Sequence, residues 1–150
     1  MPIEIRQAQV TDLDAVVPLF DAYRRFYRAA PNLALATAFI GERLRSRDSV
    51  ILLARDGDGT ALGFTQLFPS FSSVGCTRIF VRNDLHVAKS GRGRGVGRAL
   101  LAAARSCALE AGAARLVLET AVDNQAAQVL YESFGFERES GFFSDTLPVA

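Results

Sequence analysis

Four glycines stand at every second position from Gly91 to Gly97, in the stretch DLHVAKSGRGRGVGRALL. The residues before them are predicted to form a strand, and the residues after them follow the pattern of a helix. A strand that enters a glycine-rich turn and then a helix directs several backbone N–H groups at one point, where the helix dipole is positive. Because glycine lets a bulky ligand approach the backbone, this stretch predicts a phosphate or pyrophosphate site.

The spacing of the glycines decides between the known phosphate loops. The dinucleotide pattern GxGxxG fails, because its sixth position is Val96 when counted from Gly91 and Arg98 when counted from Gly93. The P-loop pattern fails as well, since no glycine here is followed by lysine. The spacing that fits is Arg92-x-x-Gly95-x-Gly97.

This spacing resembles the signature [Q/R]-x-x-G-x-[G/A] of the GCN5-related N-acetyltransferases, the GNAT family. The stretch NDLHVAKSGRGRG is similar to the strand and loop approach of that family, although Lys89 stands where many members have proline. Downstream, NQAAQVLYESFGFER resembles the second family signature, with its asparagine, its L-Y-E triplet and its G-F pair. The resemblance extends over about residues 50–138.

The resemblance implies that acetyl-CoA is the acetyl donor. In the family, loop N–H groups bind the pyrophosphate, here those of residues 93–98, and the preceding strand opens and pairs with the pantetheine arm, here at residues 85–87. The residues expected to bind acetyl-CoA are Leu85, His86, Val87, Arg92, Gly93, Arg94, Gly95, Val96, Gly97, Arg98, Asn124 and Tyr131.

By the same resemblance Tyr131 is the acid that protonates the departing thiolate, and a backbone N–H near Val87 polarises the thioester carbonyl. The alternative is a tyrosine whose ring only packs under the sheet. Helical spacing places Asn124 and Tyr131 on one face and lets Ala126, Val129 and Leu130 face the core.

The base that deprotonates the amine is left open among Asp84, Asn83 and His86. Polyamine- and lysine-type members have an acidic pair where this chain has Asn83-Asp84, so the first acidic residue is missing. Asp84 and His86 fall on the same strand face, where a carboxylate could hold a cationic amine or order a water. The alternatives are a salt bridge from Asp84 to Arg82 and a neutral, structural imidazole at His86.

Specificity for the acceptor is expected from the first two helices and the loop after the third strand. Tyr23, Tyr27, Phe71 and Asp21 are the candidates to line the acceptor pocket, together with Asp84. Aromatic walls suit an ammonium group. The alternative for each is packing or a solvated surface.

Composition sets limits on the class of protein. A chain of 150 residues is the size of one domain, and its net charge of +1 gives no general attraction to nucleic acid or to an anionic membrane. No apolar run is long enough for a transmembrane helix, and the charged N-terminus lacks a signal-peptide core, so a cytoplasmic protein is expected. Cys76 and Cys107 have no metal-site spacing, and no metal is predicted.

The order of the predicted elements indicates an α/β protein with a GNAT-like mixed, mostly antiparallel sheet flanked by about four helices. Helices are predicted over 11–27, with Thr11 as the N-cap, over 33–47, with Leu35, Phe39 and Leu44 on one side, after the glycines, and over 123–134, closed by Gly135. Strands are predicted over 3–9, 50–55, 60–68, 76–88 and 115–120, with a loop over 70–75 and a terminal pair over 136–149.

These observations predict an acetyl-CoA-dependent N-acetyltransferase that acts by direct attack of a small-molecule primary amine, such as a polyamine or an amino acid. The alternatives are a protein N-terminal or lysine acetyltransferase and a non-catalytic acyl-CoA-binding module. No nucleic-acid or membrane partner is expected. By analogy with the family, a homodimer through the terminal strands is a further expectation.

Overall fold

The computed structural model describes residues 2–150, and for Arg82 and Asn83 it describes the backbone only. The chain divides into two compact units, residues 1–119 and residues 120–150. The first unit contains, in chain order, β1 (Glu4–Gln7), α1 (Leu13–Phe26), α2 (Leu33–Ser46), β2 (Val50–Arg55), β3 (Ala61–Ser72), β4 (Thr77–Val87), α3 (Val96–Glu110) and β5 (Ala113–Leu118). Short 3₁₀ turns, Val10–Asp12 and Lys89–Gly91, precede α1 and α3.

The strands of the first unit form one sheet in chain order, β1 to β5. Each of the first three pairings is antiparallel, and only β4 and β5 run parallel, joined by the crossover through α3. The sheet is therefore mixed and mostly antiparallel, and the predicted α/β fold class is confirmed.

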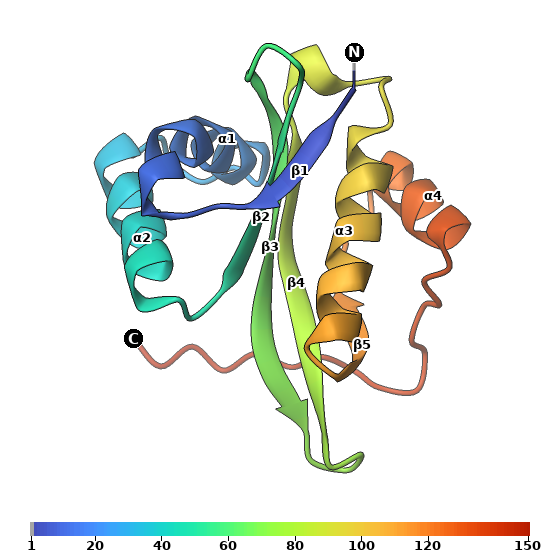
Figure 1. The fold of residues 1–150 in the computed structure, drawn as a ribbon. Helices are drawn as coiled ribbons and strands as arrows, with labels where there is room; N and C mark the ends of the chain where they lie inside the picture. The colour runs from blue at the N-terminus through green and yellow to red at the C-terminus, as the bar shows by residue number, and fades with distance from the viewer. Residues whose placement is uncertain (1) are drawn as a thin grey trace. The chain divides into compact units, whose positions relative to one another are not determined.

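Helices cover both faces of this sheet, with α1 and α2 on one face and α3 on the other (Figure 1). The first core layer packs Val16 and Phe20 of α1 and Ile40 of α2 against Ile51 and Phe64. The second core layer joins α3 to the opposite face through Val96, Leu100, Ala104, Leu62 and Leu67. Burial of apolar side chains on both faces is the main stabilisation of a sheet of this kind.

The N-cap of the first helix lies one residue later than the sequence pattern predicts. The N-cap of α1 is Asp12 instead of Thr11, and its carboxylate accepts a hydrogen bond from the Gln9 N–H over 2.8 Å. The second helix has the predicted bounds within one residue and begins at Asn32, whose side chain accepts from the Leu35 N–H over 3.0 Å.

The predicted inner face of α2 is wrong except at Leu44. Leu35 and Phe39 are exposed, and the buried positions are Ala36, Ile40, Gly41 and Leu44. Phe39 lies at the edge of the contact, where its ring stacks on Phe20 of α1 with centroids 5.7 Å apart.

Strand β3 is longer than predicted, because it continues through Pro69 to Ser72. The predicted loop over 70–75 is therefore only a turn over 73–76. The Asp56 side chain stabilises the preceding β2–β3 turn, accepting from the Asp58 N–H over 2.9 Å and the Thr60 N–H over 3.1 Å. The antiparallel pairing of β2 with β3 and of β3 with β4 agrees with the predicted, mostly antiparallel sheet.

The second unit is built around α4 (Gln125–Phe134), which Gly135 closes at a φ of 119° as predicted. The predicted terminal strands are wrong, since residues 136–150 contain no strand. Alternating apolar residues form a strand only where a partner supplies ladder hydrogen bonds, and Pro148 lacks an N–H to donate. The apolar side chains of this segment, Phe142, Phe143, Leu147 and Val149, are exposed.

Candidate functional site

The glycine loop is tied to strand β3 at its start. The Ala88 N–H donates to the carbonyl oxygen of Leu62 over 2.8 Å, and the turn Lys89–Gly91 follows directly. Gly91 is buried, and a Cβ at this position would lie 3.0 Å from the Leu62 carbonyl oxygen. The first glycine is therefore a packing residue that lets the loop lie close to the strand.

The next glycines shape an anion site at the N-terminus of α3. Gly93 and Gly95 have φ angles of +74° and +77°, and in the described residues a Cβ at either position would meet no atom within 4 Å. The first helical bond runs from the Ala99 N–H to Gly95 O over 3.0 Å, so the N–H groups of Val96 and Gly97 have no acceptor inside the helix. This open, positively polarised end fits a pyrophosphate.

Three arginines surround this cradle, and none of them is buried: Arg92, Arg94 and Arg98. The Arg94 guanidinium donates to the Ser90 carbonyl oxygen over 3.2 Å, which holds it across the loop. Because the protein carries a net charge of only +1, the attraction of an anion to this loop depends on these local charges rather than on the charge of the whole protein.

Strand β4 separates from β5 just before the loop. Its register with β5 ends at Arg82 opposite Leu118, whereas its register with β3 continues to Val87 opposite Gly63. In the described part of the sheet, residues 85–87 therefore have a strand partner on one side only. This agrees with the opening that the resemblance predicts, and it leaves a strand edge to which an extended ligand can add.

The two faces of this strand end differ in chemistry. Leu85 and Val87 pack on the α3 side, whereas His86 lies opposite Phe64 on the side of α1. Asp84 and His86 share that second face, as predicted. Burial, then the charges of Arg92 and Arg25, lower the pKa of His86, so its imidazole is neutral at pH 7.

Asp84 is buried, with 7% of its surface exposed. Its carboxylate accepts a hydrogen bond from the Gln66 side chain over 2.5 Å, and its carbonyl oxygen accepts one from the Thr65 hydroxyl over 2.8 Å. The alternative partner Arg82 and the alternative base Asn83 lie outside the side chains that the structure describes. Sequence reasoning missed Gln66; the adjacent polar residues Thr65 and Gln66 inside an apolar strand were the available signal.

Aromatic rings from α1 lie against the same face of the sheet. The Tyr23 ring is 6.1 Å from the Phe64 ring and 5.0 Å from the Tyr27 ring, measured between centroids. Since Phe64 lies opposite His86, the structure brings Tyr23 and Tyr27 to the face that carries Asp84. Asp21 of α1 forms an ion pair over 3.2 Å with Arg25, which lies one helical turn later.

Phe71 is not part of this group. It lies five positions beyond Gln66 along β3, which corresponds to about 17 Å of strand. Its ring is exposed and contacts the guanidinium of Arg78, the residue opposite it on β4.

In the second unit, Asn124 is the N-cap of α4, and its side-chain oxygen accepts from the Ala127 N–H over 3.2 Å. Tyr131 is the buried residue of this helix, and its ring contacts Phe136 with centroids 5.8 Å apart. Of the expected core positions, Ala126 and Val129 are exposed, and Leu130 is partly buried.

Among the helices of residues 2–150, none combines the length and the apolar character that crossing a bilayer requires. The His, Cys, Asp and Glu side chains of the described residues form no group of three that could hold a metal ion.

The chain is similar to known acetyltransferases over most of its length. The model of the Acetyltransferase (GNAT) family matches residues 16–136. An uncharacterized N-acetyltransferase of Bacillus subtilis (strain 168), YhfO, is 46% identical over 140 residues, which cover 93% of each chain. A probable acetyltransferase of Haemophilus influenzae is 30% identical over 97% of this chain and 99% of its own.

Solved structures agree with this similarity. The crystal structure of a probable acetyltransferase covers 98% of both chains with a TM-score of 0.92 at 40% identity. A ribosomal-protein-alanine N-acetyltransferase from Brucella melitensis biovar Abortus 2308, at 21% identity and a TM-score of 0.81, shares the fold. On the family match and the identity to these relatives, the chain belongs to the GNAT family of acetyltransferases.

Proposed function

We propose that residues 1–150 act as one N-acetyltransferase domain that transfers the acetyl group of acetyl-CoA to a primary amine of a small molecule. The observation that carries the small-molecule acceptor is the burial of Asp84 on the aromatic face of β4. A carboxylate with so little exposed surface suits a compact ammonium group better than a lysine of a folded protein.

The donor side rests on the loop and the strand before it. The N–H groups of residues 93–98 bind the pyrophosphate, with Arg92, Arg94 and Arg98 adding charge. Residues 85–87 pair with the pantetheine arm through their backbone. By the family resemblance, Asn124 and Tyr131 are also assigned to acetyl-CoA binding.

On the acceptor side, Tyr23 and Tyr27 form the aromatic wall, and Asp84 receives the ammonium group. The ammonium group loses one proton to Asp84 and becomes the nucleophilic amine. Its nitrogen forms the new C–N bond while the C–S bond of the thioester breaks, and the second proton that the nitrogen loses replaces, through solvent, the one that Tyr131 gives up. Tyr131 returns a proton to the sulfur, and the Val87 N–H polarises the carbonyl. His86, neutral beside Asp84, is the alternative proton acceptor. Phe71 is left out of the acceptor site because of its place on β3.

The first experiment is calorimetric titration of the purified protein with acetyl-CoA, with ATP and NAD as controls. Micromolar binding of acetyl-CoA alone supports the donor site, and no binding contradicts it. The second experiment measures release of the CoA thiol with spermidine, L-lysine, L-methionine, kanamycin and a tetrapeptide with a free N-terminus. Turnover confined to the tetrapeptide would replace the small-molecule acceptor by a protein N-terminus.

A further inference from the structure

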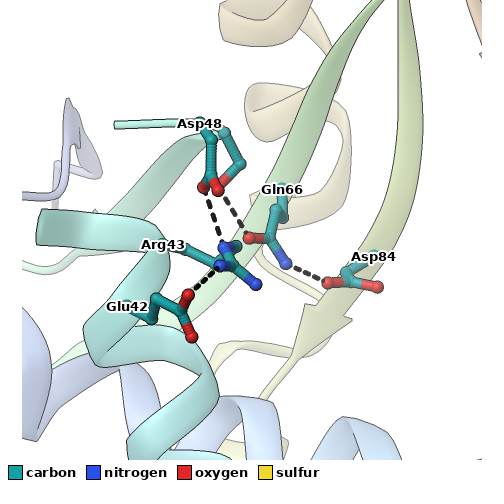
Figure 2. A network of polar contacts seen from close by, with 6 residues as sticks. Glu42, Arg43, Asp48, Gln66 and Asp84 are labelled. Carbon is teal, nitrogen blue, oxygen red and sulfur yellow. Dashed lines mark hydrogen bonds and ion pairs between the residues drawn. The ribbon is translucent and has the colours of Figure 1, made fainter. Parts of the chain in front are cut away.

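Asp84 ends a row of three buried polar side chains that crosses the sheet on the face covered by α1 and α2 (Figure 2). The Ser49 hydroxyl, directly before β2, donates to Gln66 Oε1 on β3 over 2.8 Å, and Gln66 Nε2 donates to Asp84 Oδ2 on β4 over 2.5 Å. The exposed fractions of Ser49, Gln66 and Asp84 are 8%, 0% and 7%. The orientation of the Asp84 carboxylate is therefore coupled to a residue two strands away.

The hydrogen bonds of the row run in one direction. The NH₂ group of Gln66 donates to the Asp84 carboxylate, and its carbonyl oxygen accepts from the Ser49 hydroxyl. That oxygen needs a donor, and the Ser49 hydroxyl supplies one. With both ends satisfied, the amide has one orientation and the carboxylate receives a fixed donor at Oδ2.

The row is also held at its outer end. Asp48, the residue before Ser49, accepts from Arg43 Nε of α2 over 2.8 Å, and Arg43 contacts Glu42 over 3.3 Å (Figure 2). This ion pair stabilises the turn from α2 into β2. The position of Ser49 follows from that turn.

The backbone beside Asp84 is irregular at the same place. Gln66 pairs with Asp84, but the next residue, Leu67, pairs with Arg82, so Asn83 is an extra residue in β4. An extra residue of this kind bends a strand and redirects the neighbouring side chain. At this irregular place Gln66 gives the Asp84 carboxylate a donor with a fixed direction.

On its β2 side, Gln66 has an apolar neighbour. Gln66 lies opposite Ile51, which belongs to the apolar core layer under α1 and α2. Replacing both partners of a buried hydrogen bond by apolar groups of similar shape is often neutral for stability, whereas removing the amide alone takes a hydrogen bond from Ser49 and from Asp84 and costs stability. What an apolar residue cannot provide is the donor to Asp84.

We infer that Gln66, oriented by Ser49, is a positioning residue that holds Asp84 toward the acceptor amine; this rests on the proposed function of Asp84. Gln66 does not touch the reacting atoms. Its effect is to keep one carboxylate oxygen engaged in a fixed direction, which sets where the other oxygen points. A displacement of the carboxylate by about 1 Å is sufficient to slow the reaction by roughly a hundredfold.

The test compares Gln66→Met, Asp84→Asn and the double variant, using the amine of the panel with the highest wild-type kcat/KM. Gln66→Met keeps the side-chain length and removes both hydrogen bonds of the amide. It is expected to lower kcat for the amine roughly ten- to hundredfold and to leave the KM for acetyl-CoA within about twofold. Ser49→Ala removes only the donor to the amide and is expected to lower kcat several-fold. If Gln66→Met does not fold, Ser49→Ala replaces it as the test variant.

Thr65→Val is the matched control, because the Thr65 hydroxyl donates to the backbone carbonyl of Asp84 and not to its carboxylate. This variant is expected to change the melting temperature more than kcat. If Gln66 acts through Asp84, the double variant is no slower than Asp84→Asn alone. A structural role of Gln66 instead predicts that the two losses multiply.

The outcomes separate this inference from the proposed function. If Asp84→Asn slows turnover and Gln66→Met does not, or if the losses multiply, the inference is wrong and the proposed function stands. If Asp84→Asn has the wild-type kcat, the proposed role of Asp84 is wrong and the inference falls with it. A wild-type protein that acetylates none of the amines refutes the proposed function itself.

Discussion

A Cβ added to Gly63 would lie 2.7 Å from the carbonyl oxygen of His86, across the ladder between β3 and β4. The same Cβ would be 3.3 Å from the Val87 Cα, so the conflict is with backbone that cannot rotate away. Gly63→Ala should therefore push the two strands apart at the end of β4 that leads into the glycine loop. We expect a loss of roughly 1–3 kcal/mol in the free energy of unfolding, measured by urea titration.

Gly75→Ala is the control for that substitution. A Cβ at Gly75 would come within 3.3 Å of the Ser72 and Thr77 side chains, but these lie beside an exposed turn and have room to move. Its stability should stay within about 0.5 kcal/mol of the wild type. If Gly63→Ala lost as little stability as Gly75→Ala, β3 and β4 would separate at this point at little cost in free energy.

The cradle at the start of α3 predicts how acetyl-CoA binding responds to charge. Gly95 has a φ of +77°, and a side chain added there would enter open space at the helix N-terminus. Gly95→Glu and Gly95→Gln impose the same backbone strain and nearly the same volume, so only the charge differs between them. We expect Gly95→Glu to bind acetyl-CoA at least about tenfold more weakly than Gly95→Gln at low salt, by calorimetry. Equal affinities would place the pyrophosphate elsewhere.

Sequence reasoning predicted the elements that local patterns specify. The bounds of β2 and the end of α4 at Gly135 follow from an apolar run and a glycine cap, and both agree with the structure. The glycine loop was predicted for the same reason, because its φ angles and its position before a helix are local properties. Residue roles in the site remain predictions.

What the sequence did not predict depends on contacts between distant segments. The inner face of α2 contains Ala36 and Gly41 beside Ile40 and Leu44, and the positions of Leu35 and Phe39 in the helical pattern did not identify it. Gln66 was missed because its importance comes from hydrogen bonds to Ser49 and Asp84, which are 17 and 18 positions away in the chain. No periodicity in the sequence signals such a row.

The two cysteines should differ in reactivity. Cys76 is exposed in the turn between β3 and β4, whereas burial and then Glu110 raise the pKa of the half-buried Cys107. Since the thiolate is the reactive species, Ellman's reagent at pH 8 should modify Cys76 at least about tenfold faster than Cys107. In Cys76→Ser, only the slow reaction of Cys107 with the reagent is observed. A fast phase that survives in this variant would contradict the burial of Cys107.

Tyr131 offers a test of the acid. Phenylalanine at this position keeps the ring that contacts Phe136 and removes the hydroxyl. Tyr131→Phe should lower turnover by roughly a hundredfold and leave acetyl-CoA affinity within a few-fold, because the lost proton donor acts only when the thiolate departs. Thiol release and calorimetry measure the two quantities separately. If Tyr131→Phe turned over at the wild-type rate, Tyr131 would not be the acid and its role would be packing.

His86 should make the stability of the protein depend on pH. Its pKa in the folded protein is lowered from 6.5, by burial first and by Arg92 and Arg25 next, whereas the unfolded chain keeps the ordinary value. As the pH falls below about 6.5, the unfolded state takes up the proton first, so the wild type loses stability that is fully present above that pH. His86→Asn lacks this loss, because His86 is the only histidine of the chain, and the same carboxylates are present in both proteins. The melting temperature of the wild type should therefore fall relative to that of His86→Asn between pH 7.5 and pH 5. Parallel curves would mean that the folded protein accepts the imidazolium without cost, and His86 would then carry a charge beside Asp84 when the amine arrives.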